Sequence, residues 1–227
     1  MSSASIPRRR MADSAIFLQR LESVVERQRF APLTPEARAE NLRHTMQGRA
    51  GAIWVFAYGS LIWQPVFRVA ERRKARLAGY RRSFCLWSAL ARGTPDTPGL
   101  GLGLIEDHSS VCDGIALRVE ETGRLEQLAA LWDREMWTDA YNPIWEPLDT
   151  NEGRIVALVF EANKDSQQFV GGLSDRETAQ IIARARGKFG TCREYLERTD
   201  KALQQTGIVC PDISRVRDAL PLGKAVR

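Results

Sequence analysis

The sequence is organised around one stretch, Trp54-Val55-Phe56-Ala57-Tyr58-Gly59-Ser60-Leu61-Ile62-Trp63-Gln64-Pro65. Its first part, residues 52–58, is rich in β-branched and aromatic side chains and has the length of a buried strand rather than of a helix. Gly59 ends this strand, and a positive φ at the glycine would expose successive backbone N–H groups as a concave anion site. A tight turn without a ligand is the other interpretation, because glycine turns have low specificity.

Length and composition indicate one globular domain. The chain has 227 residues, 44% of them hydrophobic and 27% charged, which is typical of a globular protein with one sizeable core. The formal net charge of +5 is concentrated in residues 1–50, where nine Arg and Lys residues accompany five Asp and Glu. The remainder is nearly neutral, so the sequence predicts no nucleic-acid partner.

Cysteine usage and hydropathy favour a reducing compartment and no membrane partner. No two of the four cysteines have C-x-x-C spacing, and a chain of this length does not need a disulfide framework, so we expect free thiols. No apolar run approaches the roughly 18 residues of a membrane span. We therefore expect a cytoplasmic protein.

Residues 1–50 are predicted to form a basic, helical N-terminal extension of a domain at 51–227. Apolar residues at helical spacing predict an amphipathic helix over about 13–28. Thr34, Pro35 and Glu36 are typical of an N-cap, a first helical position and an acidic first turn, so a second helix is expected up to about Met46. Every motif described below lies after residue 50, and removal of residues 1 to about 45 is expected to leave activity largely intact.

The centre of the chain is predicted to be a mixed α+β fold. Strand-like patterns cover residues 74–90, 111–119 and 154–160, with a bend at Gly79. Residues 92–99 have the composition of a loop. Gly99, Gly101 and Gly103 alternate with leucines and no helix follows them, which favours an irregular strand over a nucleotide loop. Several strands before any long helix argue against a regular βαβ alternation.

One carboxylate stands out in the helix predicted over residues 121–136. Glu135 follows Leu125, Leu128 and Trp132 at spacings of three, four and three, which places it in line with the apolar stripe. The two residues before it are expected to point elsewhere. A carboxylate on a buried face has to be paired, protonated or functional, and the pattern alone leaves open a glutamate that swings out to solvent or binds a core arginine.

The last third is predicted to be helical. Ser174 with Glu177, and Thr191 with Glu194, have the spacing of capping boxes, and Gly207 is expected to end the second of these two helices. A short closing helix is expected within residues 208–220.

The sequence lacks the residues that several common kinds of catalytic and binding site require. The two histidines, His44 and His108, lie outside every motif, so neither a histidine-assisted nucleophile nor a zinc site is expected. Ser60 lacks the glycines of a nucleophile elbow, and no P-loop or dinucleotide fingerprint is present. A site without metal or cofactor, using a carboxylate for proton transfer, remains.

The stretch quoted first resembles the signature of the ChaC family of γ-glutamylcyclotransferases. Further motifs resemble the same family and follow in the same order over most of the chain: Gly79-Tyr80-Arg81-Arg82-Ser83-Phe84, Arg92-Gly93-Thr94-Pro95 with Pro98-Gly99, Trp132-Asp133-Arg134-Glu135-Met136 and Arg193-Glu194-Tyr195-Leu196. The resemblance implies a γ-glutamylcyclotransferase-like fold, a small antiparallel β-barrel flanked by helices, with residues 51–227 as the catalytic domain.

The resemblance also implies an activity and a site. The family cyclises a γ-glutamyl group to 5-oxoproline, and glutathione would release cysteinylglycine. By its position in the motif, Glu135 matches the family's proton acceptor. A positioned carboxylate suits this role, since it can take a proton from the substrate's α-amine and return it to the leaving amine. The substrate-binding loop and two further contacts correspond to Ala57, Tyr58, Gly59, Ser60, Leu61 and Ile62, and to Arg92 and Tyr195.

Two departures from the family pattern concern substrate choice. Many relatives have glycine in place of Ala57, and the usual glycine-proline loop is Gly171-Gly172-Leu173 here. The partner implied is a small γ-glutamyl compound. Two alternatives stay open: a cyclotransferase for other γ-glutamyl peptides or amines, and a non-catalytic regulatory binding protein.

Overall fold

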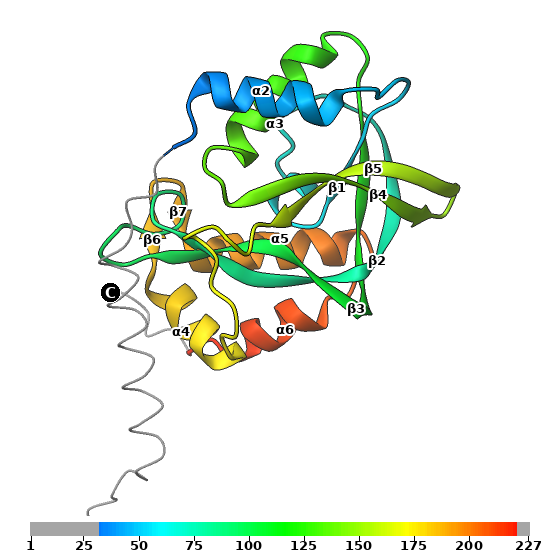
Figure 1. Ribbon diagram of the computed structural model, residues 1–227. Coiled ribbons are helices and arrows are strands. Elements are labelled where there is room, and N and C mark those ends of the chain that lie inside the picture. The colour runs from blue at the N-terminus through cyan, green and yellow to red at the C-terminus, as the bar shows by residue number, and fades with distance from the viewer. Residues whose placement is uncertain (1–31, 222–227) are drawn as a thin grey trace, which may run out of the picture.

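The computed structural model describes residues 32–221 and has an α+β fold, as predicted (Figure 1). Its helices are α2 (Pro35–Met46), α3 (Arg124–Glu135), α4 (Asp175–Arg184), α5 (Cys192–Gln205) and α6 (Pro211–Asp218), with a 3₁₀ turn, η1 (Ser60–Ile62). Its strands are β1 (Trp54–Ala57), β2 (Val69–Ser88), β3 (Gly99–Val119), β4 (Tyr141–Thr150), β5 (Gly153–Ala162), β6 (Arg186–Gly187) and β7 (Gly190–Thr191). The helix predicted over 13–28 lies outside the described residues.

Five strands close into a barrel in the order β1-β3-β2-β4-β5. Neighbours pair antiparallel, and the long β2–β3 ribbon runs from Val69 opposite Val119 to Ser88 opposite Gly99. Strand β5 closes the ring through parallel pairings of Leu158 with Val55 of β1 and of Glu161 with Leu104 of β3. The predicted barrel is therefore confirmed, with parallel contacts only at its closure.

The strand predictions succeed where the pattern is regular. A register shift between Ala78 and Tyr80 marks the bend, and Gly79 has a φ of +81°, a conformation that glycine adopts without steric cost. Strand β4 was not predicted, because Pro143 and Pro147 interrupt its pattern. It pairs with β5 along its whole length and with β2 only at its end, so most of its second edge needs no backbone donor.

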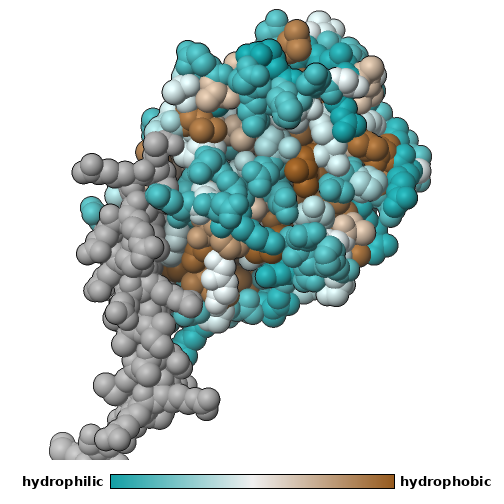
Figure 2. All heavy atoms as spheres, in the orientation of Figure 1, coloured by the Kyte–Doolittle hydropathy of each residue, from teal (hydrophilic) through white to brown (hydrophobic). Residues whose placement is uncertain are grey.

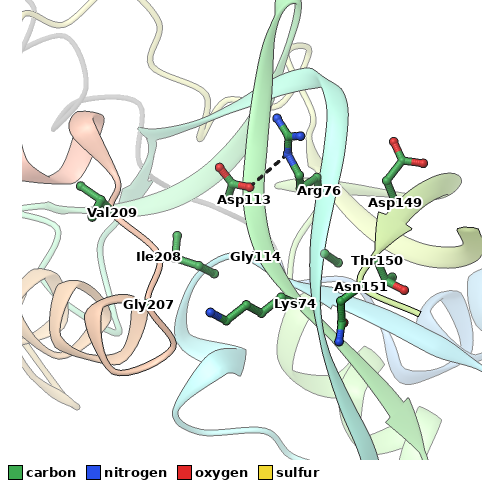
Figure 3. A pocket seen from close by; sticks show the side chains of 11 residues that line it. Lys74, Arg76, Asp113, Gly114, Asp149, Thr150, Asn151, Gly207, Ile208 and Val209 are labelled. Carbon is green, nitrogen blue, oxygen red and sulfur yellow. Dashed lines mark ion pairs between the residues drawn. The ribbon is translucent and has the colours of Figure 1, made fainter. Parts of the chain in front are cut away.

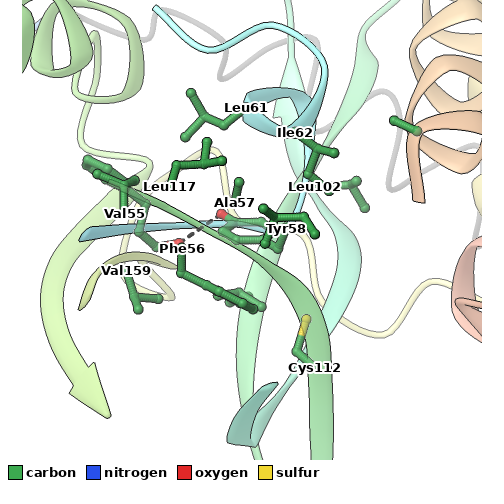
Figure 4. Packing of buried hydrophobic residues seen from close by; sticks show 14 of the residues in the cluster. Val55, Phe56, Ala57, Tyr58, Leu61, Ile62, Leu102, Cys112, Leu117 and Val159 are labelled. Atoms are coloured by element: carbon green, nitrogen blue, oxygen red, sulfur yellow. Dashed lines mark hydrogen bonds between the residues drawn. The ribbon is translucent and has the colours of Figure 1, made fainter. Parts of the chain in front are cut away.

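The main core joins the barrel strands to the helices packed on them, and Figure 4 shows the part around β1. Val55, Phe56 and Ala57 are fully buried, and the core around them includes Leu117 and Val159 from the strands paired with β1, β3 and β5 (Figure 4). Burying large apolar side chains stabilises the fold by roughly 1.5–3 kcal/mol each. Every residue of β1 is thus buried, which agrees with the buried strand predicted from the sequence.

The helices form two groups around the barrel (Figure 1). Helices α2 and α3 lie together on one side, and α4, α5 and α6 lie on the other. Both predicted capping boxes are present: Ser174 caps α4 with Glu177, and Thr191 caps α5 with Glu194. Helix α5 ends just before Gly207, and α6 is the predicted closing helix.

Helix α2 is bound to α3. Thr34 caps α2 through the Ala37 N–H, as the sequence predicted. Within the pair, Arg38 forms an ion pair of 2.9 Å with Asp133, and the indole N–H of Trp132 donates a hydrogen bond of 2.8 Å to Asn41 Oδ1. The second helix of the predicted extension is therefore packed on the helix that carries Glu135.

The visible surface is mostly hydrophilic, with apolar side chains in small separate patches (Figure 2). None of the helices in residues 32–221 combines the length and the apolar composition needed to cross a membrane.

Candidate active site

Helix α3 presents Glu135 to the interior from its last position. Leu128, Leu131 and Trp132 are buried and anchor the helix on the barrel. The predicted stripe was wrong at Leu125, a residue that is 73% exposed in the first turn of α3, and Leu131 takes its place in the packed face. The carboxylate nevertheless points inward, with 14% of the Glu135 side chain exposed.

The Glu135 carboxylate has one charged neighbour. Its Oε1 atom is inaccessible to water and accepts no hydrogen bond within the described part of the chain. The Nε atom of Arg134 lies 3.2 Å away, which makes an ion pair without the alignment of a hydrogen bond. An inaccessible carboxylate oxygen without a donor is costly, so this atom is expected to receive a ligand.

Burial raises the pKa of Glu135 above its ordinary value, while the adjacent Arg134 lowers it. The last turn of a helix is also the negative end of its dipole, where a carboxylate is disfavoured. A carboxylate whose pKa is raised toward neutrality suits both taking up and returning a proton.

Three buried tyrosines lie near enough to Glu135 to be affected by its charge: Tyr58 after β1, Tyr141 on β4 and Tyr195 on α5. Burial raises the pKa of all three, to about 12 for Tyr195, and the negative charge of Glu135 raises each further. They are therefore protonated donors at neutral pH. The hydroxyls of Tyr58 and Tyr141 each donate a 2.8 Å hydrogen bond, to the carbonyls of Phe160 and Leu102 respectively. The Tyr195 hydroxyl donates none within residues 32–221, so its proton is available to a ligand.

The turn after β1 does not have the predicted conformation at Gly59. The φ of this glycine is −134° rather than positive, so the expectation of a left-handed turn was wrong. A close approach explains the glycine instead. A Cβ atom at this position would lie 3.3 Å from the Tyr195 hydroxyl and 3.8 Å from the Leu102 side chain. A larger residue here would displace the tyrosine that faces Glu135.

Arg134 connects this turn to α3. Its guanidinium donates hydrogen bonds of 2.7 Å to Ser60 Oγ and 2.5 Å to the Gln64 carbonyl. The sequence suggested that Arg134 would point away from the glutamate, but its long side chain curls back beside it. The backbone N–H groups of Ser60 and Leu61 have no acceptor among the described residues, so they are available to a ligand.

The predicted loop contributes backbone more than side chains. The side chains of Ala57, Leu61 and Ile62 are buried in the core, so only their backbone groups could touch a ligand. Ala57 keeps a negative φ, which any residue tolerates, and the glycine of many relatives is not needed there. Tyr58 and Ser60 are the loop residues whose polar side chains reach the neighbourhood of Glu135 and Arg134.

Arg82, which lies in one of the motifs, supports the loop after β1 through hydrogen bonds. Its buried guanidinium donates to the carbonyls of Tyr58 and Asp113 at 2.5 and 2.6 Å, and to Cys210 Sγ at 3.0 Å. These bonds fix the position of the Tyr58 backbone. The burial of this arginine was not predicted from the sequence.

Arg92 lies at the outer side of Tyr195. Its guanidinium is 5.4 Å from the centre of the tyrosine ring, and it donates to the Phe189 carbonyl in the β6–β7 turn. The structure therefore brings together Glu135, the turn at residues 58–60 and Tyr195, with Arg92 on the rim. Two site residues were not identified from sequence: Arg134, despite its place in a motif, and Tyr141, on the strand that was not predicted.

A separate cavity of about 540 Å³ contains none of these residues (Figure 3). It lies against β2 and β3, beside the turn between β4 and β5 and the segment after α5. Its charged groups include Lys74 and an ion pair between Arg76 and Asp113 (Figure 3). Residues 32–221 contain no group of three or more His, Cys, Asp or Glu side chains arranged to hold a metal ion.

Known proteins resemble this chain over most of its length. Residues 53–218 match the family model described as ChaC-like protein. The chain is 36% identical to a glutathione-specific gamma-glutamylcyclotransferase of Escherichia coli, over 76% of this chain and 75% of that protein. It is 30% identical to the human glutathione-specific gamma-glutamylcyclotransferase 1, over 70% of this chain and 73% of the relative.

A solved structure has the same fold. The crystal structure of a yeast gamma-glutamylcyclotransferase specific to glutathione superposes with a TM-score of 0.69 at 22% identity, covering 75% of this chain and 96% of the yeast chain. The family match spans the barrel, Glu135 and helices α3 to α6. The chain belongs to the ChaC family.

Proposed function

We propose that this protein is a γ-glutamylcyclotransferase that cleaves glutathione into 5-oxoproline and cysteinylglycine. The substrate is a small molecule, and the reaction needs no cofactor because the nucleophile is the substrate's own α-amine. The named relatives support glutathione as the substrate, since those from Escherichia coli and human are described as glutathione-specific. We place the reaction in the cytoplasm, in keeping with four buried free cysteines.

One observation carries this proposal: among residues 32–221 no group donates a hydrogen bond to the buried Oε1 atom of Glu135. Arg134, next to it at the end of α3, joins this atom to the turn after β1. An ammonium or amine group is the complement that this atom lacks. The α-amine of a γ-glutamyl group supplies it.

The reaction proceeds by intramolecular attack. The nitrogen of the neutral α-amine attacks the γ-carbonyl carbon and closes a five-membered lactam while Glu135 accepts one proton from that nitrogen. The amide bond to cysteine breaks as the protonated Glu135 returns the proton to the leaving amine. The amine and the carbonyl belong to the same molecule, so the site contributes by holding the bonds between them in the geometry of attack.

The turn and Tyr195 position the substrate. The free N–H groups of Ser60 and Leu61 suit the α-carboxylate of the γ-glutamyl group, because backbone donors and an adjacent guanidinium, that of Arg134, favour an anion. The Tyr195 hydroxyl has its proton available for the oxygen of the γ-carbonyl, where negative charge develops during attack. Arg92 contacts the substrate from the rim.

The proposal is tested by identifying the products of the purified protein with glutathione. Cyclisation releases 5-oxoproline and cysteinylglycine in equal amounts, whereas hydrolysis would release glutamate. Glutathione acetylated on its α-amine is the matched control, because it keeps the amide but lacks the nucleophile. Release of glutamate, or cleavage of the acetylated compound at a similar rate, would contradict the proposal.

A further inference from the structure

Two guanidinium groups flank the aromatic residues at the outer edge of the site. Arg92 lies over the ring of Tyr195 at 5.4 Å, and Arg198 lies over the ring of Trp63 at 5.6 Å. Trp63 follows the η1 turn directly, and its indole N–H donates a 3.3 Å hydrogen bond to Thr199 of α5. The two arginines are therefore attached to the two elements that frame the site, α5 and the turn after β1.

Arg198 lies on the same side of α5 as Tyr195. Positions three apart on a helix are neighbours, so the side chain that follows Tyr195 by three residues is adjacent to it on the helix surface. The hydroxyl end of Tyr195 approaches Gly59 in the interior, while Arg92 lies against its ring from the rim. Tyr195 thus separates an inner, carboxylate-bearing end of the site from an outer, guanidinium-bearing end.

Positive charge at this outer end exceeds the negative charge available to neutralise it. Neither Arg92 nor Arg198 has a carboxylate within 4.0 Å in the part of the chain that the structure describes. Glu194 is the nearby acid, and its carboxylate accepts a 2.8 Å hydrogen bond from the Thr191 N–H in the cap of α5. Burial lowers the pKa of Arg92, and the charge of Arg198 lowers it further, whereas Glu194 raises it.

Arg186 adds a third positive charge to this region. It and Arg198 both lower the pKa of Glu194, after the larger effect of the cap hydrogen bonds. Three guanidinium groups therefore share one carboxylate that is already occupied. Such an excess attracts an anion and speeds its encounter with the site.

We infer that Arg92 and Arg198 bind a second carboxylate of the substrate, at the end remote from the γ-glutamyl group. The inference rests on the proposed function and specifies the substrate class: γ-glutamyl peptides with a free C-terminal carboxylate. Glutathione carries this group on its glycine.

This site discriminates between γ-glutamyl peptides and γ-glutamylamines. An amine has no second carboxylate, so it leaves the two guanidinium groups unneutralised. Arg198 is exposed, so water screens its contact with a carboxylate, and its removal is expected to lower the apparent affinity about three- to tenfold.

The test compares glutathione with its glycine ethyl ester, which differs only in the second carboxylate. For the wild type, KM for the ester is expected to exceed KM for glutathione about tenfold, with kcat similar. Arg198→Gln is expected to raise KM for glutathione about three- to tenfold and to leave KM for the ester unchanged. Lys201→Gln is the matched control, since it removes an exposed positive charge from the same helix and should leave both values unchanged.

A second measurement separates this inference from the proposed function. Equilibrium binding of both compounds to Glu135→Gln, by calorimetry, reports the carboxylate site without turnover. Tighter binding of glutathione than of the ester, lost on adding Arg198→Gln, supports the inference even if the wild type releases no cysteinylglycine, a result that would contradict the proposed function alone. Equal affinity for the two compounds, or equal effects of Arg198→Gln on both, overturns the inference.

Discussion

The Nε atom of Arg134 lies 3.2 Å from Oε1 of Glu135, yet no hydrogen bond joins them. The same guanidinium donates instead to Ser60 Oγ and to the Gln64 carbonyl. Arg134 therefore acts on the glutamate through its charge while it holds the turn after β1 in place. The carboxylate keeps a free oxygen for the substrate.

Replacing Arg134 is expected to move the pH dependence of the reaction. The base must be ionised, so activity falls as the pH drops through the pKa of Glu135, which burial raises and Arg134 lowers. Arg134→Gln removes the lowering charge, so the midpoint of the acid limb of kcat should shift to higher pH. Arg134→Lys keeps the charge and should restore the midpoint. The groups that also face Glu135, from β1, β4 and α5, are Tyr58, Tyr141 and Tyr195, and all stay protonated there. An unchanged midpoint in Arg134→Gln would show that this arginine only supports the turn.

Glu135→Gln is expected to stabilise the protein at neutral pH. Because the folded-state pKa of Glu135 is raised, its stabilising contribution is complete when the group is protonated and is lost as the pH rises through that pKa. The neutral glutamine avoids this loss, with a gain on the order of 1 kcal/mol in the free energy of unfolding. Urea denaturation should show the gain at pH 7 and little difference near pH 4.5, the ordinary value for the group. A less stable variant at pH 7 would mean that the ion pair with Arg134 outweighs burial.

Gly59→Val is expected to reduce activity more than Ser60→Ala. The valine Cβ would lie 3.3 Å from the Tyr195 hydroxyl, and its methyl groups extend farther, so the tyrosine must move. A displacement of about 1 Å in a positioning group can cost about a hundredfold in rate. Ser60→Ala removes one acceptor of Arg134, which keeps its bond to Gln64. Steady-state kinetics on both variants, checked by circular dichroism, decide the point; equal activities would remove Tyr195 from the site.

Two truncations should behave differently. Removing residues 1–31 leaves every contact within residues 32–221 and should leave kcat/KM within about twofold of the full chain.

Removing residues 1–46 also deletes α2, and with it the Asn41 acceptor of Trp132 and the Arg38 partner of Asp133. We expect the free energy of unfolding to fall by about 3 kcal/mol or more, with activity lost as α3 loosens. Full activity and unchanged stability in the shorter chain would show that α2 does not support the site. From sequence, residues 1 to about 45 were expected to be dispensable for activity. With α2 packed on α3, we expect this only of residues 1–31.

The sequence was informative where chemistry is local. The caps at Thr34, Ser174 and Thr191 were predicted because side-chain oxygens satisfy N–H groups within three residues. Helical spacing to Leu128 and Trp132 placed Glu135 in line with the buried face, although the pattern alone left open a side chain that turns to solvent or binds a core arginine. These features depend on a few neighbouring positions in the sequence and not on how the strands close into a barrel.

The site's supporting residues could not be predicted, because they depend on contacts distant in sequence. Tyr141 lies on β4, a strand that was not predicted because two prolines interrupt its pattern. Arg82 donates a hydrogen bond to the Tyr58 carbonyl in the loop, 24 positions earlier in the sequence. The φ of Gly59 was predicted wrongly. A glycine is required there because the Tyr195 hydroxyl leaves too little room for a side chain, and Tyr195 lies more than a hundred residues later in the sequence. Closing the barrel brings these groups together.

The most direct test of the account is single-turnover release of cysteinylglycine from bound glutathione by Glu135→Gln. Glu126→Gln is the matched control, since Glu126 lies exposed in the first turn of the same helix. Glutamine keeps the size of the side chain but cannot accept the amine proton, and loss of a positioned general base commonly costs about a hundredfold to ten-thousandfold in rate. We predict near-normal glutathione binding and a rate reduced by at least a hundredfold in Glu135→Gln, with wild-type behaviour in Glu126→Gln. Turnover by Glu135→Gln within about tenfold of the wild type would contradict the assignment of Glu135 as the base.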